Sequence, residues 1–257
     1  MTEHVLNEIA DGVLGLTLNR PEKKNAITDE MYEALSGELE RANADPHVRV
    51  VLLRPRGDAF TAGNDIASFA RQSAVPSEAA GPSNASRFIR AIARCEKPIV
   101  AGVRGQAVGV GLTMLLHCDL VIVARDARLS APFVNLALVP EAASSRLLTE
   151  RIGHVRAFSM FAAGQAIDGD TAAQWGLANR AVASDEVDAE AWAAARLLAT
   201  RPRQSLTATK RLMRDHTAIS EQIEQEMIEF AARLASPEAR EAFQAFAERR
   251  APDFANV

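Results

Sequence analysis

The sequence is poor in cysteine and aromatic residues and has no large excess of charge. Two cysteines among 257 residues are too few for a disulfide framework and lack metal-ligand spacing, which suits a reducing compartment. The net charge of -4, with scattered basic residues, excludes the electrostatic footprint of a nucleic-acid or anionic-membrane binder. No window reaches the roughly 18 apolar residues of a membrane span, and no signal-peptide pattern opens the chain. We expect a cytoplasmic protein without nucleic-acid or membrane partners, and Cys95 and Cys118 as core residues.

Length and patterning predict an α/β fold with one large core, either as a single domain or as a main domain with a helical appendage. The strands Val5–Ile9 and Val13–Leu18 flank Asp11-Gly12, which is typical of a hairpin turn. Further strands are expected at 48–53, 99–103, 119–124 and 178–182, with a short edge strand at 127–130. Helices are expected at 28–43, 83–94, 112–117, 144–163, 168–176, 185–199, 202–216, 220–234 and 237–250.

The helices after residue 185 carry apolar stripes that need a partner surface. One stripe runs through Ile223, Met227, Phe230 and Leu234. It must pack against the sheet or against another subunit.

The stretch Ala59 to Asp65 follows the strand at 48–53 and contains small residues and a glycine. Ala62 and Gly63 permit close approach of a ligand to the backbone, and main-chain N–H groups there are suited to binding an oxyanion. Taken alone, the stretch is more typical of an ordinary strand-to-helix turn, with Asp65 as a helix cap rather than a base. Residues 71–82, rich in Ser, Ala, Pro and Gly, are a candidate mobile lid.

A second glycine-rich stretch, Gly105 to Gly111, leads into the helix at 112–117. It lacks the Gly-Lys-Ser/Thr of a phosphate loop and the pattern of a dinucleotide fold, so its glycines serve close approach rather than phosphate binding. His117 is interpreted as a core or partly exposed residue. Downstream, Glu141 interrupts the apolar run 131–140, and from the residues alone Pro140 and Glu141 are best interpreted as the first positions of a helix.

Together these segments resemble the crotonase superfamily, the enoyl-CoA hydratase/isomerase family, over essentially the whole chain. One such motif is weak evidence, but the ordered set is specific. The matching segments are Asn19-Arg20-Pro21 with Asn25-Ala26, Phe60 to Asp65, Lys97-Pro98 to Gly102, Gly105 to Gly111, Cys118-Asp119, and Ala242-Phe243 to Phe254.

The resemblance implies a spiral of ββα units over residues 1–183 that carries an acyl-CoA site, and a helical trimerisation region over 184–257. It implies a homotrimer or dimer of trimers, and no metal or cofactor, because coenzyme A enters as part of the substrate thioester. The thioester carbonyl would lie between the N–H groups of Asn64 and Val110. The implied substrate contacts are Ala62, Gly63, Asp65, Gly109, Phe133 and Leu138, and the implied CoA contacts are Phe246 and Arg249, toward a neighbouring subunit, and Lys23, for which a solvated loop is an equal alternative.

Two departures from the family pattern bear on the reaction. Family hydratases use two glutamates, whose positions read Thr113 and Phe133 here, and neither residue is a base. The segment Pro140 to Ser145 resembles the Pro-Glu-x-x-Ser-Ser of Δ3,Δ2-enoyl-CoA isomerases, which implies Glu141 as the base. Apolar neighbours at Phe133, Val134 and Leu138 are expected to raise its pKa. The alternatives are a hydratase or another crotonase-type enzyme, and a non-catalytic acyl-CoA-binding protein.

Overall fold

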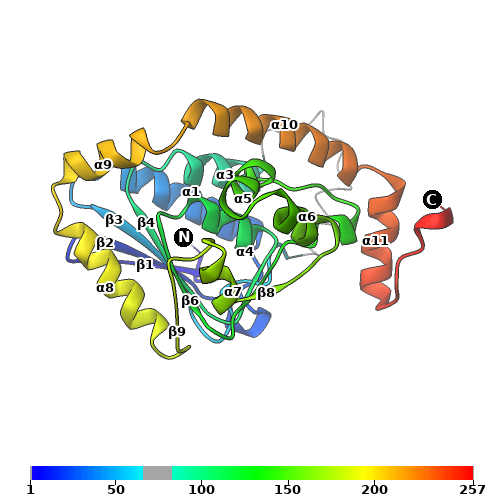
Figure 1. Cartoon of the computed structure of the whole chain (residues 1–257), viewed down its shortest axis with the longest axis horizontal. Coiled ribbons are helices and arrows are strands. Elements are labelled where there is room, and N and C mark those ends of the chain that lie inside the picture. The colour runs from blue at the N-terminus through cyan, green and yellow to red at the C-terminus, as the bar shows by residue number, and fades with distance from the viewer. Residues whose placement is uncertain (1, 66–82, 257) are drawn as a thin grey trace.

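The structure, a computed structural model, describes residues 2–65 and 83–256 and contains two β-sheets packed among helices (Figure 1). The larger sheet has six strands in the order β1-β2-β3-β4-β6-β9. Only β1 and β2 are antiparallel; every other pair in this sheet is parallel. The strands are β1 (Val5–Ala10), β2 (Val13–Leu18), β3 (Val50–Pro55), β4 (Ile99–Val103), β6 (Leu120–Ala124) and β9 (Arg180–Val182).

The first two strands form the hairpin that the sequence predicts. Asp11 and Gly12 both have positive φ, 53° and 76°, as a tight hairpin turn requires. β2 and β3 are almost entirely buried, whereas β1 is buried only at Val5 and forms one edge of the sheet. The buried parallel strands are therefore the nearly continuous apolar runs of the sequence.

Helices cover both faces of this sheet. In Figure 1, α8 (Val187–Ala199) lies on one side, where it contacts β3, β4 and β6, and α1 (Asp29–Ala44) and α3 (Asn84–Ala93) lie together on the other. Thr28 and Ser83 cap α1 and α3 by accepting backbone N–H bonds.

The smaller sheet has the order β5-β7-β8, with β5 (Gln106–Val108), β7 (Arg128–Ser130) and β8 (Ile167–Asp168). The prediction of an edge strand at 127–130 is therefore wrong, because β7 is the middle strand. Its neighbours contain only three and two residues, which is too short for an alternating pattern to identify them. β5 forms inside the glycine-rich stretch and brings it beside β7.

The remaining elements are mostly helical, and from residue 187 onward the described chain contains only helices and their connections, which confirms a helical C-terminal region. α10 begins at His216, four residues earlier than predicted, because Asp215 caps it. The remaining helices before residue 180 are η1 (Pro21–Lys23), α4 (Val110–Thr113), η3 (Met114–His117), η4 (Val134–Leu136), α5 (Ser144–Ile152), α6 (His154–Ala162) and α7 (Gly169–Gln174). Those after α8 are α9 (Arg203–Leu212), α10 (His216–Leu234), α11 (Pro237–Glu248) and η5 (Phe254–Asn256).

α10 crosses the molecule along α3 and then turns into α11, which contacts η4 (Figure 1). Of the predicted α10 stripe, Ile223 is buried, and Met227, Phe230 and Leu234 are half-buried against the core. The division of the chain at residues 183 and 184 stays a prediction. The lid predicted at 71–82 lies outside the described residues. Within the described ranges, no helix has both the length and the apolar composition needed to cross a membrane.

Candidate active site

Two loops leave the large sheet at the same edge. β3 and β4 are parallel neighbours, so the loops after Pro55 and Val103 emerge side by side. Thr61 of the first loop pairs with β5 in the second: its N–H donates to the Gln106 carbonyl at 2.9 Å, and its carbonyl accepts from Val108 at 3.1 Å. The backbone of residues 59–65 is therefore fixed against the glycine-rich stretch.

Glycines make this close contact possible. A Cβ on Gly63, whose φ is 89°, would lie 2.8 Å from the Val108 carbonyl oxygen. A Cβ on Gly111 would lie 2.5 Å from Thr61 Cγ2. Gly63 and Gly111 therefore allow the two loops to pack closely against each other. Gly109, at φ 57°, turns the chain so that α4 begins at Val110, two residues before the predicted start.

Each loop presents one outward-facing backbone amide. Around Asn64, the Gly63 carbonyl and the Asp65 N–H both bond to Ile27, at 2.8 and 2.9 Å, so the Asn64 N–H between them points the other way. Val110 occupies the first position of α4, where an N–H has no partner within the helix. Neither amide donates to an acceptor in residues 2–65 and 83–256. Two amides on adjacent loops are therefore available to a ligand oxygen.

Glu141 lies outside any helix, and the prediction that Pro140 and Glu141 open one is wrong. α5 starts three residues later, because Ala142 and Ala143 are left-handed, at φ 62° and 55°, and turn the chain first. Ser144 closes the turn by donating its N–H to the Glu141 carbonyl at 3.1 Å. The turn directs the Glu141 side chain inward, so that this residue is only 7% exposed.

The Glu141 carboxyl group is buried and asymmetric. Its Oε1 accepts the Thr113 hydroxyl at 2.5 Å, whereas its Oε2 has no partner in the described parts of the chain. Burial raises the pKa of Glu141 to about 8; the Thr113 hydrogen bond opposes this and the charge of Glu226 adds to it. Thr113, at a position where family hydratases have a glutamate, therefore orients the carboxyl group through one oxygen and leaves the other without a hydrogen bond in the described chain.

The apolar residues expected around Glu141 are placed unequally. Phe133 and Leu138 are buried, and the Phe133 ring packs on Phe161 with centroids 6.0 Å apart. Val134 is 46% exposed and does not form a closed wall. Phe133 adds no polar atom to the site.

Tyr32, the only tyrosine of the chain, is a site residue that the sequence analysis missed. It projects from α1, is buried, and donates its hydroxyl to Oδ1 of Asn64. Its ring packs on Phe88 at 5.5 Å. Burial raises the pKa of Tyr32 well above its ordinary value, and the negative charge of Glu141 raises it further. Tyr32 thus ties the Asn64 loop to α1, although its position beside the Met31–Leu35 stripe is typical of a core residue.

His117 supports the turn after Glu141 from inside the core. Nδ1 lies 3.0 Å from Arg214 Nη2 and Nε2 lies 2.8 Å from the Ala142 carbonyl oxygen. Because a guanidinium only donates, Nδ1 must accept, and Nε2 carries the hydrogen and donates to Ala142. Burial, assisted by the positive charge of Arg214, lowers the pKa of His117 to about 3, so the ring stays neutral. Of the two predicted alternatives, a core residue or a partly exposed one, the structure shows that His117 is a core residue.

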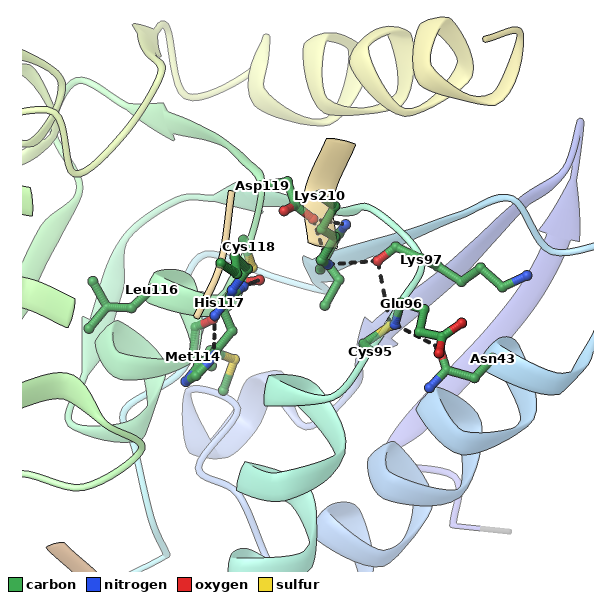
Figure 2. A network of polar contacts seen from close by, with 12 residues as sticks. Asn43, Cys95, Glu96, Lys97, Met114, Leu116, His117, Cys118, Asp119 and Lys210 are labelled. Atoms are coloured by element: carbon green, nitrogen blue, oxygen red, sulfur yellow. Dashed lines mark hydrogen bonds and ion pairs between the residues drawn. The ribbon is translucent and has the colours of Figure 1, made fainter. Parts of the chain in front are cut away.

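A second polar network docks α9 next to His117 (Figure 2). Lys210 is buried and donates to the Lys97 carbonyl and to Asp119 Oδ2, both at 2.8 Å. Asp119 Oδ2 also accepts the Ile99 N–H at the start of β4. Cys95 Sγ contacts the same Lys97 carbonyl at 3.6 Å. Cys95 and Cys118 are both buried and free, which confirms them as core residues. This network attaches the C-terminal helices to the core.

The segment around Lys23 lies beside the first amide loop. Ala62 donates its N–H to the Lys24 carbonyl at 2.9 Å. Buried Asn25 donates from Nδ2 to the Ala59 carbonyl at 2.7 Å, and its own carbonyl accepts the Thr61 hydroxyl at 2.6 Å. Lys23 itself is exposed. The structure therefore brings the Lys23 segment to the edge of the candidate site.

Other predicted residues lie at the periphery. Asp65 accepts from Arg20 in an ion pair of 2.7 Å, while the helix that it was predicted to cap lies outside the described residues. Phe246 is 56% exposed on α11, and Arg249 is exposed at its C-cap. Their contacts with CoA stay predictions. No group of three or more His, Cys, Asp or Glu suited to a metal occurs in residues 2–65 and 83–256.

Comparisons with known proteins agree with this geometry. The family model described as enoyl-CoA hydratase/isomerase matches residues 8–256. The chain is 32% identical to the 1,2-epoxyphenylacetyl-CoA isomerase of Escherichia coli K12, over 99% of both chains. It is 30% identical to the 2,3-dehydroadipyl-CoA hydratase of the same organism, over 94% of each chain. With enoyl-CoA delta isomerase 2 of Rattus norvegicus it shares 31% identity over 93% of this chain and 62% of that protein.

A crystal structure of an enoyl-CoA hydratase/isomerase from Pseudoalteromonas atlantica T6c superimposes with a TM-score of 0.92. It is 43% identical and covers 98% of this chain and 100% of that one. Both isomerases and hydratases thus occur among the relatives. The chain is an enzyme of the enoyl-CoA hydratase/isomerase family, in the crotonase superfamily.

Proposed function

We propose that the protein is a Δ3,Δ2-enoyl-CoA isomerase with Glu141 as its single base. The observation that carries the proposal is the state of the Glu141 carboxyl group: buried, oriented by Thr113 through Oε1 and unpartnered at Oε2 within the described chain. A base with an unbonded oxygen and a pKa of about 8 suits proton transfer near neutral pH.

In the proposed reaction Glu141 Oε2 removes a proton from C2 of a 3-enoyl-CoA. The electron pair moves toward the thioester carbonyl, whose oxygen becomes an enolate held by the Asn64 and Val110 N–H groups. Each such donor contributes on the order of 3 kcal/mol to the transition state. Glu141 then returns the proton to C4, and the double bond lies between C2 and C3. The reaction needs no cofactor, because coenzyme A is part of the substrate.

The surroundings of Glu141 favour isomerisation over hydration. Hydration needs a group that activates water and a group that protonates carbon. Thr113 and Phe133 stand at the two positions where family hydratases have glutamates, and buried Phe133 offers water no hydrogen bond. A single carboxylate suffices for a proton shift from C2 to C4.

The exposed C-terminal helices support the further proposal that this region assembles the protein into trimers. Leu212, Ile228 and Phe246, on α9, α10 and α11, are large apolar side chains with exposures of 84%, 70% and 56%. Apolar surface of this kind favours self-association. Under this proposal Phe246 and Arg249 contact the CoA nucleotide bound to a neighbouring subunit, and Lys23 contacts CoA from beside the amide loops.

The test is to supply 3-enoyl-CoA and 2-enoyl-CoA and to follow the absorbance of the conjugated thioester. We expect wild type to convert the 3-enoyl thioester and Glu141→Gln to lose at least roughly 10²-fold in kcat, since general-base catalysis contributes 10²–10⁴-fold. The control is Glu150→Gln, at an exposed glutamate of α5. Unchanged activity in Glu141→Gln would remove Glu141 from its role. Efficient hydration of the 2-enoyl thioester would instead indicate a hydratase. Binding of either thioester without turnover would indicate a non-catalytic acyl-CoA-binding protein.

A further inference from the structure

Three buried oxygens without partners in the described chain belong to residues that neighbour one another in sequence or through the Glu226–Ser145 hydrogen bonds. They are Glu141 Oε2, Ser144 Oγ and Glu226 Oε2. Two of them belong to the turn and first helical residue that follow Pro140, and the third comes from α10, more than 80 residues later. Buried polar atoms without partners are rare in folded proteins and mark sites where a proton, a water or a ligand is handled.

Glu226 bonds directly to the start of α5. Only 6% exposed, it accepts through Oε1 the Ser145 N–H at 2.9 Å and the Ser145 hydroxyl at 2.5 Å. Gln222, one turn earlier in α10, donates to Ser145 Oγ at 3.0 Å. The residue that would normally cap α5, Ala143, has no side-chain acceptor. Glu226 therefore acts as a cap supplied by another helix, with its negative charge at the positive end of α5.

The backbone between Glu141 and Ser145 needs such a hold. Ala142 and Ala143 are both left-handed, a conformation that is unfavourable for residues other than glycine. Strained residues of this kind persist only where surrounding contacts fix them. His117 bonds the Ala142 carbonyl on one side, and Glu226 bonds Ser145 on the other.

We propose that Glu226 is a positioning residue of the active site, which fixes Glu141 by holding the strained turn at Ser145 and acts on it with its own negative charge. The inference rests on the proposed role of Glu141 as base. It gives the C-terminal helix α10 a direct part in the site.

The charge on Glu226 has a defined effect on the base. The titratable groups that act on Glu141 are Tyr32 from α1 and Glu226 from α10, and burial raises the pKa of both. A neighbouring negative charge disfavours a second one, so Glu226 raises the pKa of Glu141. Removing that charge while keeping the hydrogen bond lowers this pKa and moves the acid limb of the activity profile to lower pH.

Two substitutions separate charge from geometry. Glu226→Gln keeps a carbonyl oxygen for the Ser145 N–H and loses the charge, whereas Glu226→Ala loses both. Glu229→Gln, at an exposed position of the same helix, is the matched control. The readouts are kcat and KM as functions of pH, and a carbon-13 NMR titration of glutamate carboxyl groups in which the Glu141 signal is assigned by its absence from Glu141→Gln.

For Glu226→Gln we expect two midpoints, that of the acid limb of the kcat profile and that of the Glu141 NMR titration, to fall by roughly 0.5 pH unit or more. We expect kcat at high pH to change only a few-fold. For Glu226→Ala we expect kcat to fall roughly tenfold or more with little change in KM, because Glu141 loses its orientation. If Glu226→Ala does not fold, Glu226→Gln alone decides the proposal. Midpoints in Glu226→Gln equal to those of wild type and Glu229→Gln would overturn it. The NMR titration needs no turnover, so it separates this proposal from the proposed function. If wild type does not isomerise 3-enoyl-CoA but the Glu141 midpoint still differs between wild type and Glu226→Gln, the effect of Glu226 on Glu141 is supported and the isomerase function is refuted.

Discussion

The raised pKa of Glu141 makes the stability of the protein depend on pH in a way that Glu141→Gln should abolish. The folded pKa is about 8 against an ordinary value of 4.5. Between these values the folded state holds a proton that the unfolded state has released, so stability falls as pH rises. The contribution is fully present below pH 4.5 and is lost as pH passes 8. At about 1.4 kcal/mol per pKa unit, the whole range corresponds to on the order of 5 kcal/mol.

His117 sets the pH range in which the effect of Glu141 is seen by itself. Its pKa is about 3 in the folded protein against 6.5 ordinarily, so its contribution is present above pH 6.5 and is lost as pH falls. Between pH 4.5 and 6.5 the two contributions have opposite slopes and cancel. Above pH 6.5 the contribution of His117 is constant, and from pH 6.5 to 9 the ionisation of Glu141 costs wild type about 2 kcal/mol.

The assay is urea unfolding of wild type and Glu141→Gln at pH 5.5, 6.5, 7.5 and 9, at one fixed protein concentration because assembly would shift the midpoints. Glutamine keeps an oxygen for the Thr113 hydroxyl, so the substitution removes the titration and preserves the packing. We expect the unfolding free energy of wild type to drop relative to Glu141→Gln by about 2 kcal/mol between pH 6.5 and 9. A constant difference between the two proteins across this range would refute a raised pKa at Glu141. Glu150→Gln should follow wild type.

Two further substitutions test the groups that touch the base and the amide loop. Thr113→Val removes the hydrogen bond that lowers the pKa of Glu141, so the midpoint of the kcat/KM profile should move to higher pH; a midpoint that stays or falls would contradict the assigned role of Thr113. Tyr32→Phe removes the hydroxyl that holds the Asn64 side chain, and kcat should fall roughly threefold to thirtyfold with KM nearly unchanged, measured with 3-enoyl-CoA, because the oxyanion donor loses its fixed orientation. An unchanged kcat in Tyr32→Phe would show that the Asn64 backbone is held without Tyr32.

The fold is predictable from the sequence where elements are long enough to show a period. The hairpin at Asp11-Gly12, the buried parallel strands and the helical C-terminal region follow from local patterns, and the structure confirms them. The small sheet could not be predicted, because β5 and β8 are too short for alternation. For the same reason β7 was expected at an edge and lies in the middle.

The candidate site is predictable only as far as its chemistry is local in sequence. The two amide loops and Glu141 stand in motifs a few residues long. Tyr32 and Glu226 lie more than 80 residues from Glu141 in the chain, and each acts on Glu141 only when α1 and α10 pack. A signal was nevertheless present for Glu226: it lies three residues after Ile223, on the face that α10 buries, where a carboxylate needs a partner.

Thr113 places a hydrogen-bond donor, rather than a second carboxylate, next to Glu141. A carboxylate within hydrogen-bonding distance of Glu141 would compete with it for one proton, because two like charges so close are not both ionised. A threonine hydroxyl at 2.5 Å donates instead, lowers the pKa of Glu141 and fixes which of its oxygens is unbonded. Under the proposed isomerase function, a donor at this position, together with Phe133, leaves Glu141 as the one carboxylate of the site. The backbone amides at Asn64 and Val110 would be compatible with either reaction, since their proposed role is at the thioester oxygen, so the proposed choice of reaction rests on Thr113, Phe133 and Glu141.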